Sequence, residues 1–261
     1  MSILIAGINV FKGQLISELI LMKRYWLNLA AGTVNMFLFL IFIQFGIRSF
    51  GGGVSTEFLA GKMGTLIVGF FSFSIIGVGI TSITSRISDN TATGILEQTM
   101  LGPLGIEWTL FFGAVTQFAT ALVLYLLLLP ITMFLCGHFF KLNMLQLVLL
   151  TVPLWLASCG VGFVLGAASL VYKKTQNFSN LIQFLILTLM VMPSYPFSGY
   201  SLLPISPQAA ILHSVIVLHQ PIGWGWLAYL FAQSAAYLIL GSIIFKEAEK
   251  YAKEKGILGQ Y

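Results

Sequence analysis

Residues 86–108, RISDNTATGILEQTMLGPLGIEW, form a polar internal stretch that separates two long apolar stretches. The stretch before it, Met63–Ser85, and the stretch after it, Trp108–Phe140, contain no Asp, Glu, Lys or Arg. Each can supply the roughly 20 apolar residues with which a helix crosses a bilayer. We therefore expect two membrane spans joined by a structured polar loop, and this pair decides the fold class.

The composition extends this expectation to the whole chain. Hydrophobic residues make up 58% of the sequence and charged residues 8%, and the mean hydropathy is +0.95. A soluble domain carries roughly 25% charged residues. Because the apolar runs are continuous and do not alternate, a transmembrane barrel is disfavoured and a helical bundle remains. The prediction is an all-α integral membrane protein with a single transmembrane domain over residues 1–261.

Charge-free stretches predict six spans, which puts both termini on one side of the membrane. The expected spans are Tyr25–Ile47, Met63–Ser85, Trp108–Phe140, Leu142–Tyr172, Phe178–Phe197 and Trp226–Phe245. With this topology, ten of the 13 Lys and Arg residues fall on the side of the termini, and Arg48, Lys62 and Lys141 fall on the other. Since positive residues stay cytoplasmic, we expect a multi-pass protein of the bacterial plasma (inner) membrane with both termini and the 86–108 loop in the cytoplasm.

Residues 1–24 predict a helix that lies along the cytoplasmic membrane surface. Apolar residues recur at helical spacing, namely Ile8, Phe11, Leu15, Leu19 and Met22. Glu18 falls among them and breaks the pattern. Its carboxylate could meet a partner or a residue of the bundle, or the helix could be irregular there, and the sequence leaves these alternatives open.

Two further patterns concern packing. Residues 198–225 carry no charge, and the apolar run Gln208–Leu218 is too short to cross a membrane, which predicts a re-entrant or interfacial pair of short helices at the outer end. Ser158, Gly162 and Gly166 form a ladder of small residues that permits close helix contact, either within the chain or with a second copy.

The sequence predicts neither a catalytic nor a metal site. The spans lack Asp, Glu, Lys and Arg, which disfavours ion-driven transport and an intramembrane enzyme. The three histidines are isolated, whereas a zinc site needs several ligands close together. No basic stripe with aromatics indicates nucleic acid, and no G-x-x-x-x-G-K-[ST] motif indicates a nucleotide site. If transport is active, its energy must come from another polypeptide.

The 86–108 loop is where such energy could enter. Thr93 can cap a helix, Glu97 would lie in its first turn, and Gly102 with Pro103 can end it. The result is a helix of about eight residues, near 12 Å long. A short rigid helix on the cytoplasmic face could transmit a push, although Glu97 could equally serve only to satisfy the helix dipole.

Taken together, the surface helix, the six spans, the loop and the proline-rich outer segment resemble the permease subunits of type-2 ABC exporters. In that family the loop typically reads G-T-L-E-Q, four further residues and Pro. The residues that match in order are Gly94, Leu96, Glu97, Gln98 and Pro103. The resemblance implies a coupling helix over residues 94–103, including Ile95 and Leu101, that sits in a groove of a separate ATPase. It also implies that the N-terminal helix, with Phe11 and Glu18, braces the ATPase.

The resemblance also implies the composition and task of the working unit. It implies two ATPase subunits that bind ATP and Mg, and two permease copies, expected as a homodimer, with no cofactor on this chain. The expected task is export of an amphiphilic or hydrophobic compound, a drug or a lipid. Leu21–Trp26, LMKRYW, partly matches an R-D-L-x-x-R-Y-like stretch of the glycan-exporting branch, so a lipid-linked polysaccharide is an alternative cargo. A passive channel or membrane scaffold without an ATPase is the alternative from another class.

Overall fold

The computed structural model describes residues 2–27, 31–32, 34–35, 38, 41–42, 56–92, 94–95, 99, 105–136, 143–172 and 176–255. These residues form helices and connecting turns, with no strand among them. The helices are α1 (Ser2–Arg24), α3 (Thr56–Ala92), α5 (Gly105–Cys136), α6 (Met144–Tyr172), α7 (Gln176–Val191), the 3-10 helix η1 (Gly199–Leu202), α8 (Ser206–Ile216) and α9 (Trp224–Glu254). The all-helical prediction is confirmed for this part of the chain.

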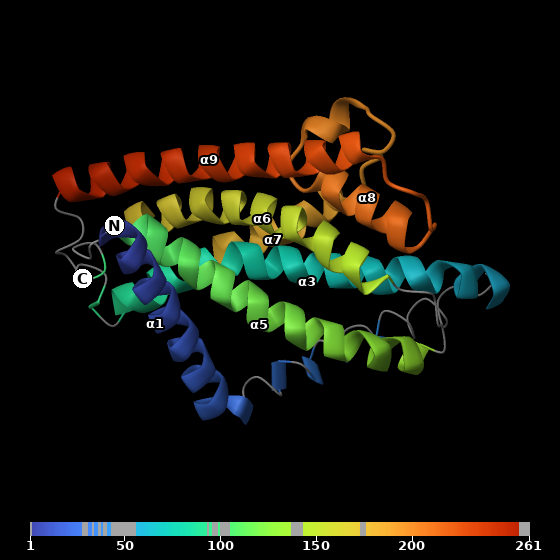
Figure 1. Cartoon of the computed structure of the whole chain (residues 1–261), viewed down its shortest axis with the longest axis horizontal. Helices are drawn as coiled ribbons and strands as arrows, with labels where there is room; N and C mark the ends of the chain where they lie inside the picture. The colour runs from blue at the N-terminus through green and yellow to red at the C-terminus, as the bar shows by residue number, and fades with distance from the viewer. Residues whose placement is uncertain are drawn as a thin grey trace.

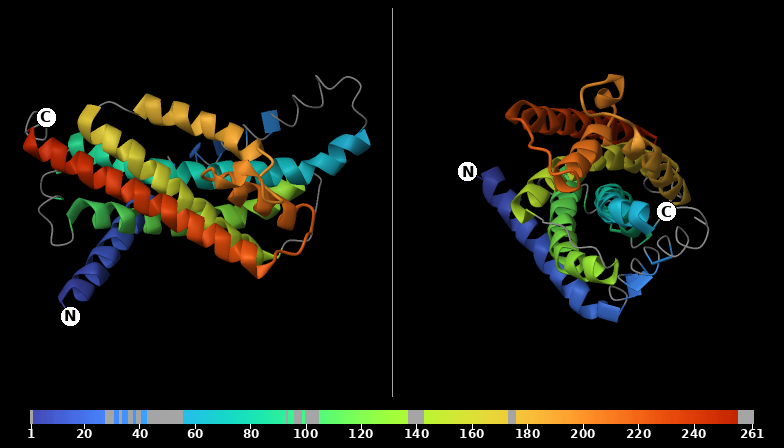
Figure 2. Two further views of the ribbon diagram at one scale, coloured as in Figure 1. Left: turned by 90° about the horizontal axis from the view of Figure 1, so that it is seen from above. Right: turned by 90° about the vertical axis from the view of Figure 1, so that its right-hand side faces the viewer.

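Four helices are long and apolar enough to cross a membrane, which supports a multi-pass membrane protein. They are Gly64–Thr91 in α3, Gly105–Phe134 in α5, Met144–Tyr172 as α6 and Trp224–Glu254 as α9. These correspond to the predicted second, third, fourth and sixth spans. In Figures 1 and 2 they run lengthwise together, while α1 crosses the bundle near one end and α8 lies near the other.

The predicted first and fifth spans do not form helices of span length in the described residues. Most of Tyr25–Ile47 lies outside them. The predicted fifth span, Phe178–Phe197, is wrong at its end, because α7 stops at Val191 after 16 residues. Such a helix is about 24 Å long, less than the roughly 30 Å of a bilayer core. Pro193 and Pro196 follow, and they lack the N–H with which a helix would continue.

The core of the bundle is the contact of α6 with α3 and α9. A methyl group on Gly162 of α6 would lie 2.9 Å from the carbonyl oxygen of Gly79 in α3. On the neighbouring face of α6, a methyl group on Gly160 would lie 2.5 Å from the carbonyl oxygen of Tyr237 in α9. Small residues therefore let three backbones approach closely. Ser158 and Gly166 also face α3, so the small-residue ladder packs within the chain and is not left free for a second copy.

Candidate functional site

Within the 86–108 stretch, α3 continues to Ala92 and ends in a Schellman motif at Gly94. The Gly94 N–H donates to the Thr91 carbonyl at 3.2 Å, and the Ile95 N–H donates to the Asn90 carbonyl at 2.9 Å. Gly94 has a φ of 69°, the left-handed conformation that this motif requires and that glycine adopts without a steric cost. The second apolar helix thus extends past its predicted end at Ser85 and includes the polar residues up to Ala92.

This ending changes the expected start of the loop helix. The sequence predicted that Thr93 caps the loop helix and that Gly94 is its first residue. Gly94 instead terminates α3, so it cannot begin the next helix. Further along, the Thr99 N–H donates to the Ile95 carbonyl at 3.0 Å, a spacing of four residues. The remaining predicted coupling residues lie outside the described residues, namely Leu96, Glu97, Gln98, Leu101 and Pro103.

Arg86, two turns before the end of α3, joins three helices at the base of the loop. Its guanidinium forms an ion pair with Glu18 of α1 and donates to the side-chain oxygen of Gln14 at 3.0 Å. It also donates to the carbonyl of Gly113 in α5, at 3.1 Å. A methyl group on Gly113 would lie 2.8 Å from the guanidinium carbon, so the absence of a side chain there makes room for the arginine. We call Arg86, Glu18, Gln14 and Gly113 the arginine node.

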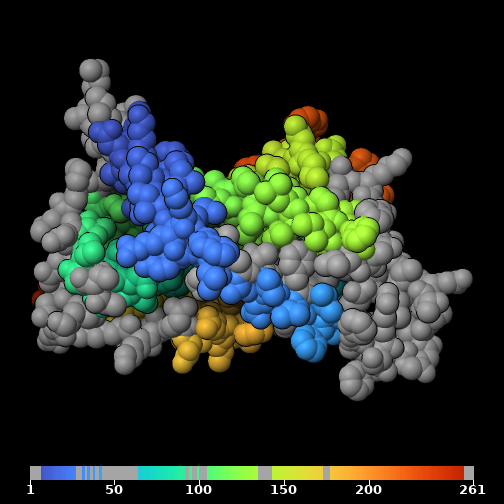
Figure 3. All heavy atoms as spheres, turned by 90° about the horizontal axis from the view of Figure 1, so that it is seen from below, coloured from blue at the N-terminus to red at the C-terminus, as the bar shows by residue number. Residues whose placement is uncertain are grey.

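The arginine node answers the question that Glu18 raised. The Glu18 carboxylate contacts Arg86, a residue of the bundle, and the Glu18 side chain is only 16% exposed. The face of α1 that packs on α5 contains Gly7, Phe11 and Gln14 as well as Glu18, spaced by three or four residues. Of the predicted apolar face, Phe11 packs on Phe112 of α5, whereas Ile8, Leu15 and Leu19 are exposed. Figure 3 shows α1 lying on the outside of the bundle across this end.

Aromatic side chains continue the contact from α1 into α5. The Phe11 ring meets the Phe112 ring edge-on, with centroids 6.2 Å apart. The Trp108 ring lies 6.0 Å from Phe112 and 6.3 Å from Phe111. Edge-on and tilted ring pairs of this kind stabilise packing by roughly 0.5–1.5 kcal/mol beyond area burial. The first turns of α5 are thus held by α1 on one side and face a cavity on the other.

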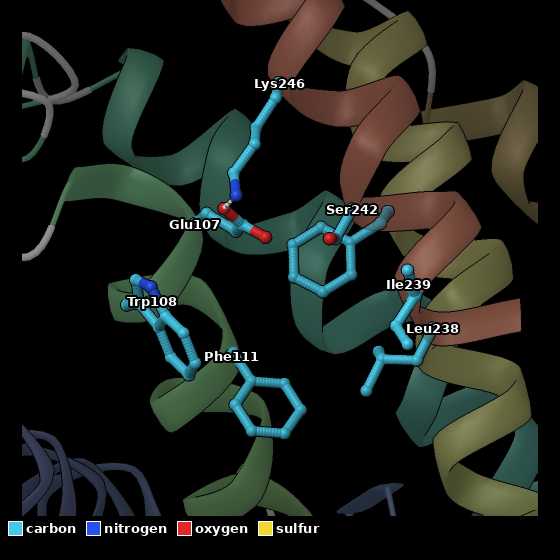
Figure 4. Close-up of a pocket in the computed structure, with 8 residues that line it drawn as sticks. Glu107, Trp108, Phe111, Leu238, Ile239, Ser242 and Lys246 are labelled. Atoms are coloured by element: carbon cyan, nitrogen blue, oxygen red, sulfur yellow. Dashed lines mark ion pairs between the residues drawn. The ribbon is translucent and has the colours of Figure 1, made fainter. Parts of the chain in front are cut away.

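That cavity, of about 320 Å³, lies between α5, α6 and α9 (Figure 4). An ion pair marks its polar end, where the Lys246 Nζ of α9 lies 2.9 Å from a carboxylate oxygen of Glu107 in α5. Trp108, Phe111 and Leu238 supply apolar walls. The sequence pattern missed this pair, because Glu107 and Lys246 are far apart in the chain and each lies one residue outside a predicted span.

The opposite end of the bundle holds the predicted outer segment. The short helices η1 and α8 are present there, and the Gln233 amide of α9 donates to the carbonyls of Ser201 at 2.9 Å and Leu203 at 3.0 Å. A second cavity, of about 370 Å³, lies between α3, α7 and α8, where His213 bonds to the Thr65 hydroxyl at 2.9 Å. No group of three or more His, Cys, Asp or Glu that could hold a metal occurs among the described residues.

The chain matches no protein-family model, and no curated protein matches its sequence. The sequence pointed to the loop and to Glu18, and the structure adds Arg86, Gln14 and Gly113 as the contacts that connect them. The signal that was available in the sequence was a lone arginine at the end of an apolar span and a lone glutamate within an apolar helix face.

Proposed function

We propose that this chain is the membrane-spanning subunit of a type-2 ABC exporter and that a separate ATPase drives it. The observation that carries the proposal is the G-I-L-E-Q…P sequence of residues 94–103, which connects two span-length helices, α3 and α5. A partner that grips this loop can act on both helices at once. The working unit contains two copies of this chain and two ATPase subunits, which bind the ATP and Mg.

The arginine node supports a mechanical role for this end of the bundle. Arg86 lies eight residues before Gly94 and is bonded to α1 and α5 as well as belonging to α3. A displacement of the loop therefore moves α1, α3 and α5 together and does not only bend the end of α3. Because α3 packs closely on α6, and α6 on α9, the same displacement reaches the centre of the bundle. In this proposal α1 braces the loop and the ATPase that binds it.

The orientation follows from the charges. The ends of α3 and α9 and the starts of α1 and α5 share one end of the bundle (Figure 1). Lys246, Lys250, Lys253 and Lys255 are all at this end. In our proposal it faces the cytoplasm, in agreement with the tendency of basic residues to stay on that side, and η1 and α8 close the outer end of the path as a re-entrant segment.

An amphiphilic or hydrophobic cargo, a drug or a lipid, agrees best with the apolar walls of both cavities. A lipid-linked glycan is the alternative cargo within the same mechanism, and a passive channel or scaffold is the alternative mechanism. The test is flux of a labelled phospholipid or lipophilic dye in proteoliposomes that contain the chain with its ATPase. The proposal expects flux only with ATP and both proteins, whereas equal flux from the chain alone without ATP would establish a channel.

A further inference from the structure

We infer that the cavity between α5, α6 and α9 is a binding site for one zwitterionic phospholipid whose headgroup carries a primary ammonium. The occupant lies beside the bundle as a bound lipid, with its phosphate on Lys246, its ammonium on Glu107 and one acyl chain inside the cavity. This inference needs only a membrane-embedded chain and does not depend on the proposed ATPase. Failure of the transport proposal would therefore leave it standing, and the reverse also holds.

Two facing stripes of side chains build the cavity (Figure 4). On α9, Leu238, Ser242 and Lys246 follow one another at intervals of four residues and so share one helix face. On α5, Glu107 and Phe111 are also four residues apart and so share one helix face. Figure 4 shows the charged pair at one end of the cavity and the Phe111 and Leu238 side chains towards the other.

The cavity is therefore polar at one end and apolar at the other, along the direction of the helices. Lys246 and Leu238 are eight residues apart on α9, which is about 12 Å of helix. A lipid in the leaflet at this end of the bundle has the same arrangement, with its headgroup at the membrane surface and its chain along the helices. The volume of about 320 Å³ is near the lower end of the roughly 300–1,000 Å³ of ligand pockets, which suits the headgroup-proximal part of one acyl chain rather than a whole lipid.

Charge complementarity selects the headgroup. The Lys246 side chain is 60% exposed, so its ammonium can bond to an incoming phosphate while it stays near Glu107, which is 15% exposed. A phosphate alone would neutralise Lys246 but would place a second negative charge beside Glu107. A headgroup with both a phosphate and a primary ammonium pairs with both residues, and its N–H groups can donate to the carboxylate. The site should therefore prefer phosphatidylethanolamine to phosphatidylglycerol.

The test is competition between these two lipids for the full-length chain, read by native mass spectrometry of the protein released from mixed nanodiscs. The wild type should retain phosphatidylethanolamine roughly tenfold over phosphatidylglycerol, the ratio expected for one charge-assisted hydrogen bond. Phosphatidylcholine, which cannot donate to Glu107, should bind less than phosphatidylethanolamine. The preference is a ratio measured within one protein, so a loss of folded protein lowers both lipids alike; retention itself is therefore normalised to the folded fraction of each variant.

Variants assign the preference to the cavity. Glu107→Gln should remove the preference or shift it towards phosphatidylglycerol, and Lys246→Gln should weaken retention of both lipids. Ser242→Phe should fill the cavity and abolish retention of either lipid. The control is Lys250→Gln, which removes one exposed lysine one turn further along α9, outside the cavity, and should behave as the wild type. Equal retention of all lipids by the wild type, or retention unchanged in Ser242→Phe, would overturn the inference.

Discussion

Replacing Glu18 by alanine should release α1 from the bundle. In the native structure the Glu18 carboxylate pairs with Arg86, whose side chain is 21% exposed, while the carboxylate side chain is 16% exposed. An exposed ion pair contributes roughly 0.2–1 kcal/mol, and breaking a buried one costs roughly 3–5 kcal/mol. The arginine keeps its bonds to Gln14 and Gly113, which limits the loss. We therefore expect a cost of about 2 kcal/mol, between the two limits.

Hydrogen exchange of the α1 amides measures this cost directly, because exchange reports local opening. Each 1.36 kcal/mol changes the opening equilibrium about tenfold, so a cost of about 2 kcal/mol should make exchange about 30-fold faster. Glu18→Gln keeps a hydrogen-bond acceptor but loses the charge, so it should give a smaller acceleration. The control is Ser17→Ala, since Ser17 is the exposed neighbour of Glu18 on the same helix and should leave the rates unchanged.

A double-mutant cycle completes the test. Because Glu18 and Arg86 contact each other, the combined variant Glu18→Ala, Arg86→Ala should cost less than the sum of the single replacements. Additive effects, or α1 exchange that Glu18→Ala does not accelerate, would show that the arginine node does not hold α1, and the mechanical argument would then fail.

Three further outcomes are expected. Gly241→Ala should destabilise the bundle by about 1–3 kcal/mol in thermal unfolding, because its new methyl group meets backbone, whereas Gly69→Ala, with open space around it, should not. Gln233→Leu should make the segment before α8 more sensitive to protease, because two of its carbonyls lose a donor. Membrane-impermeant maleimide should label a cysteine at Lys250 only from the cytoplasm and one at Tyr200 only from outside; labelling of both from one side would contradict the proposed orientation.

The apolar runs predicted the long helices well, because a membrane helix must satisfy its own backbone bonds and so follows hydropathy. They located α3, α5, α6 and α9, with differences mainly at the ends. The end of α3 was missed because Ser88 to Thr91 are polar, and only the left-handed geometry of Gly94 fixes where that helix stops. The early end of α7 at Val191 was missed because an uncharged run does not reveal how much of it is helical.

The contacts between helices were less accessible from sequence. Spacing along α1 placed Glu18 within an apolar face but could not identify Arg86, which is 68 residues away, as its partner. The sequence also could not decide what packs on the small-residue ladder. Small residues suit a neighbouring helix of the same chain and one of a second copy equally well. Long-range pairs of this kind become visible only when the helices are assembled.

The most direct measurement of the central claim is copurification of the ATPase with the full-length chain from its native membrane, read as the molar ratio of a phosphate-loop ATPase to the chain. The account predicts about one ATPase per chain, both for the wild type and for Lys141→Ala. Lys141 lies on the predicted outer side of the membrane, away from the ATPase. The account predicts at least a tenfold lower ratio for the double variant Glu97→Ala, Leu101→Ala with an unchanged melting temperature. An equal ratio in the loop variant, or loss caused by Lys141→Ala instead, would contradict it.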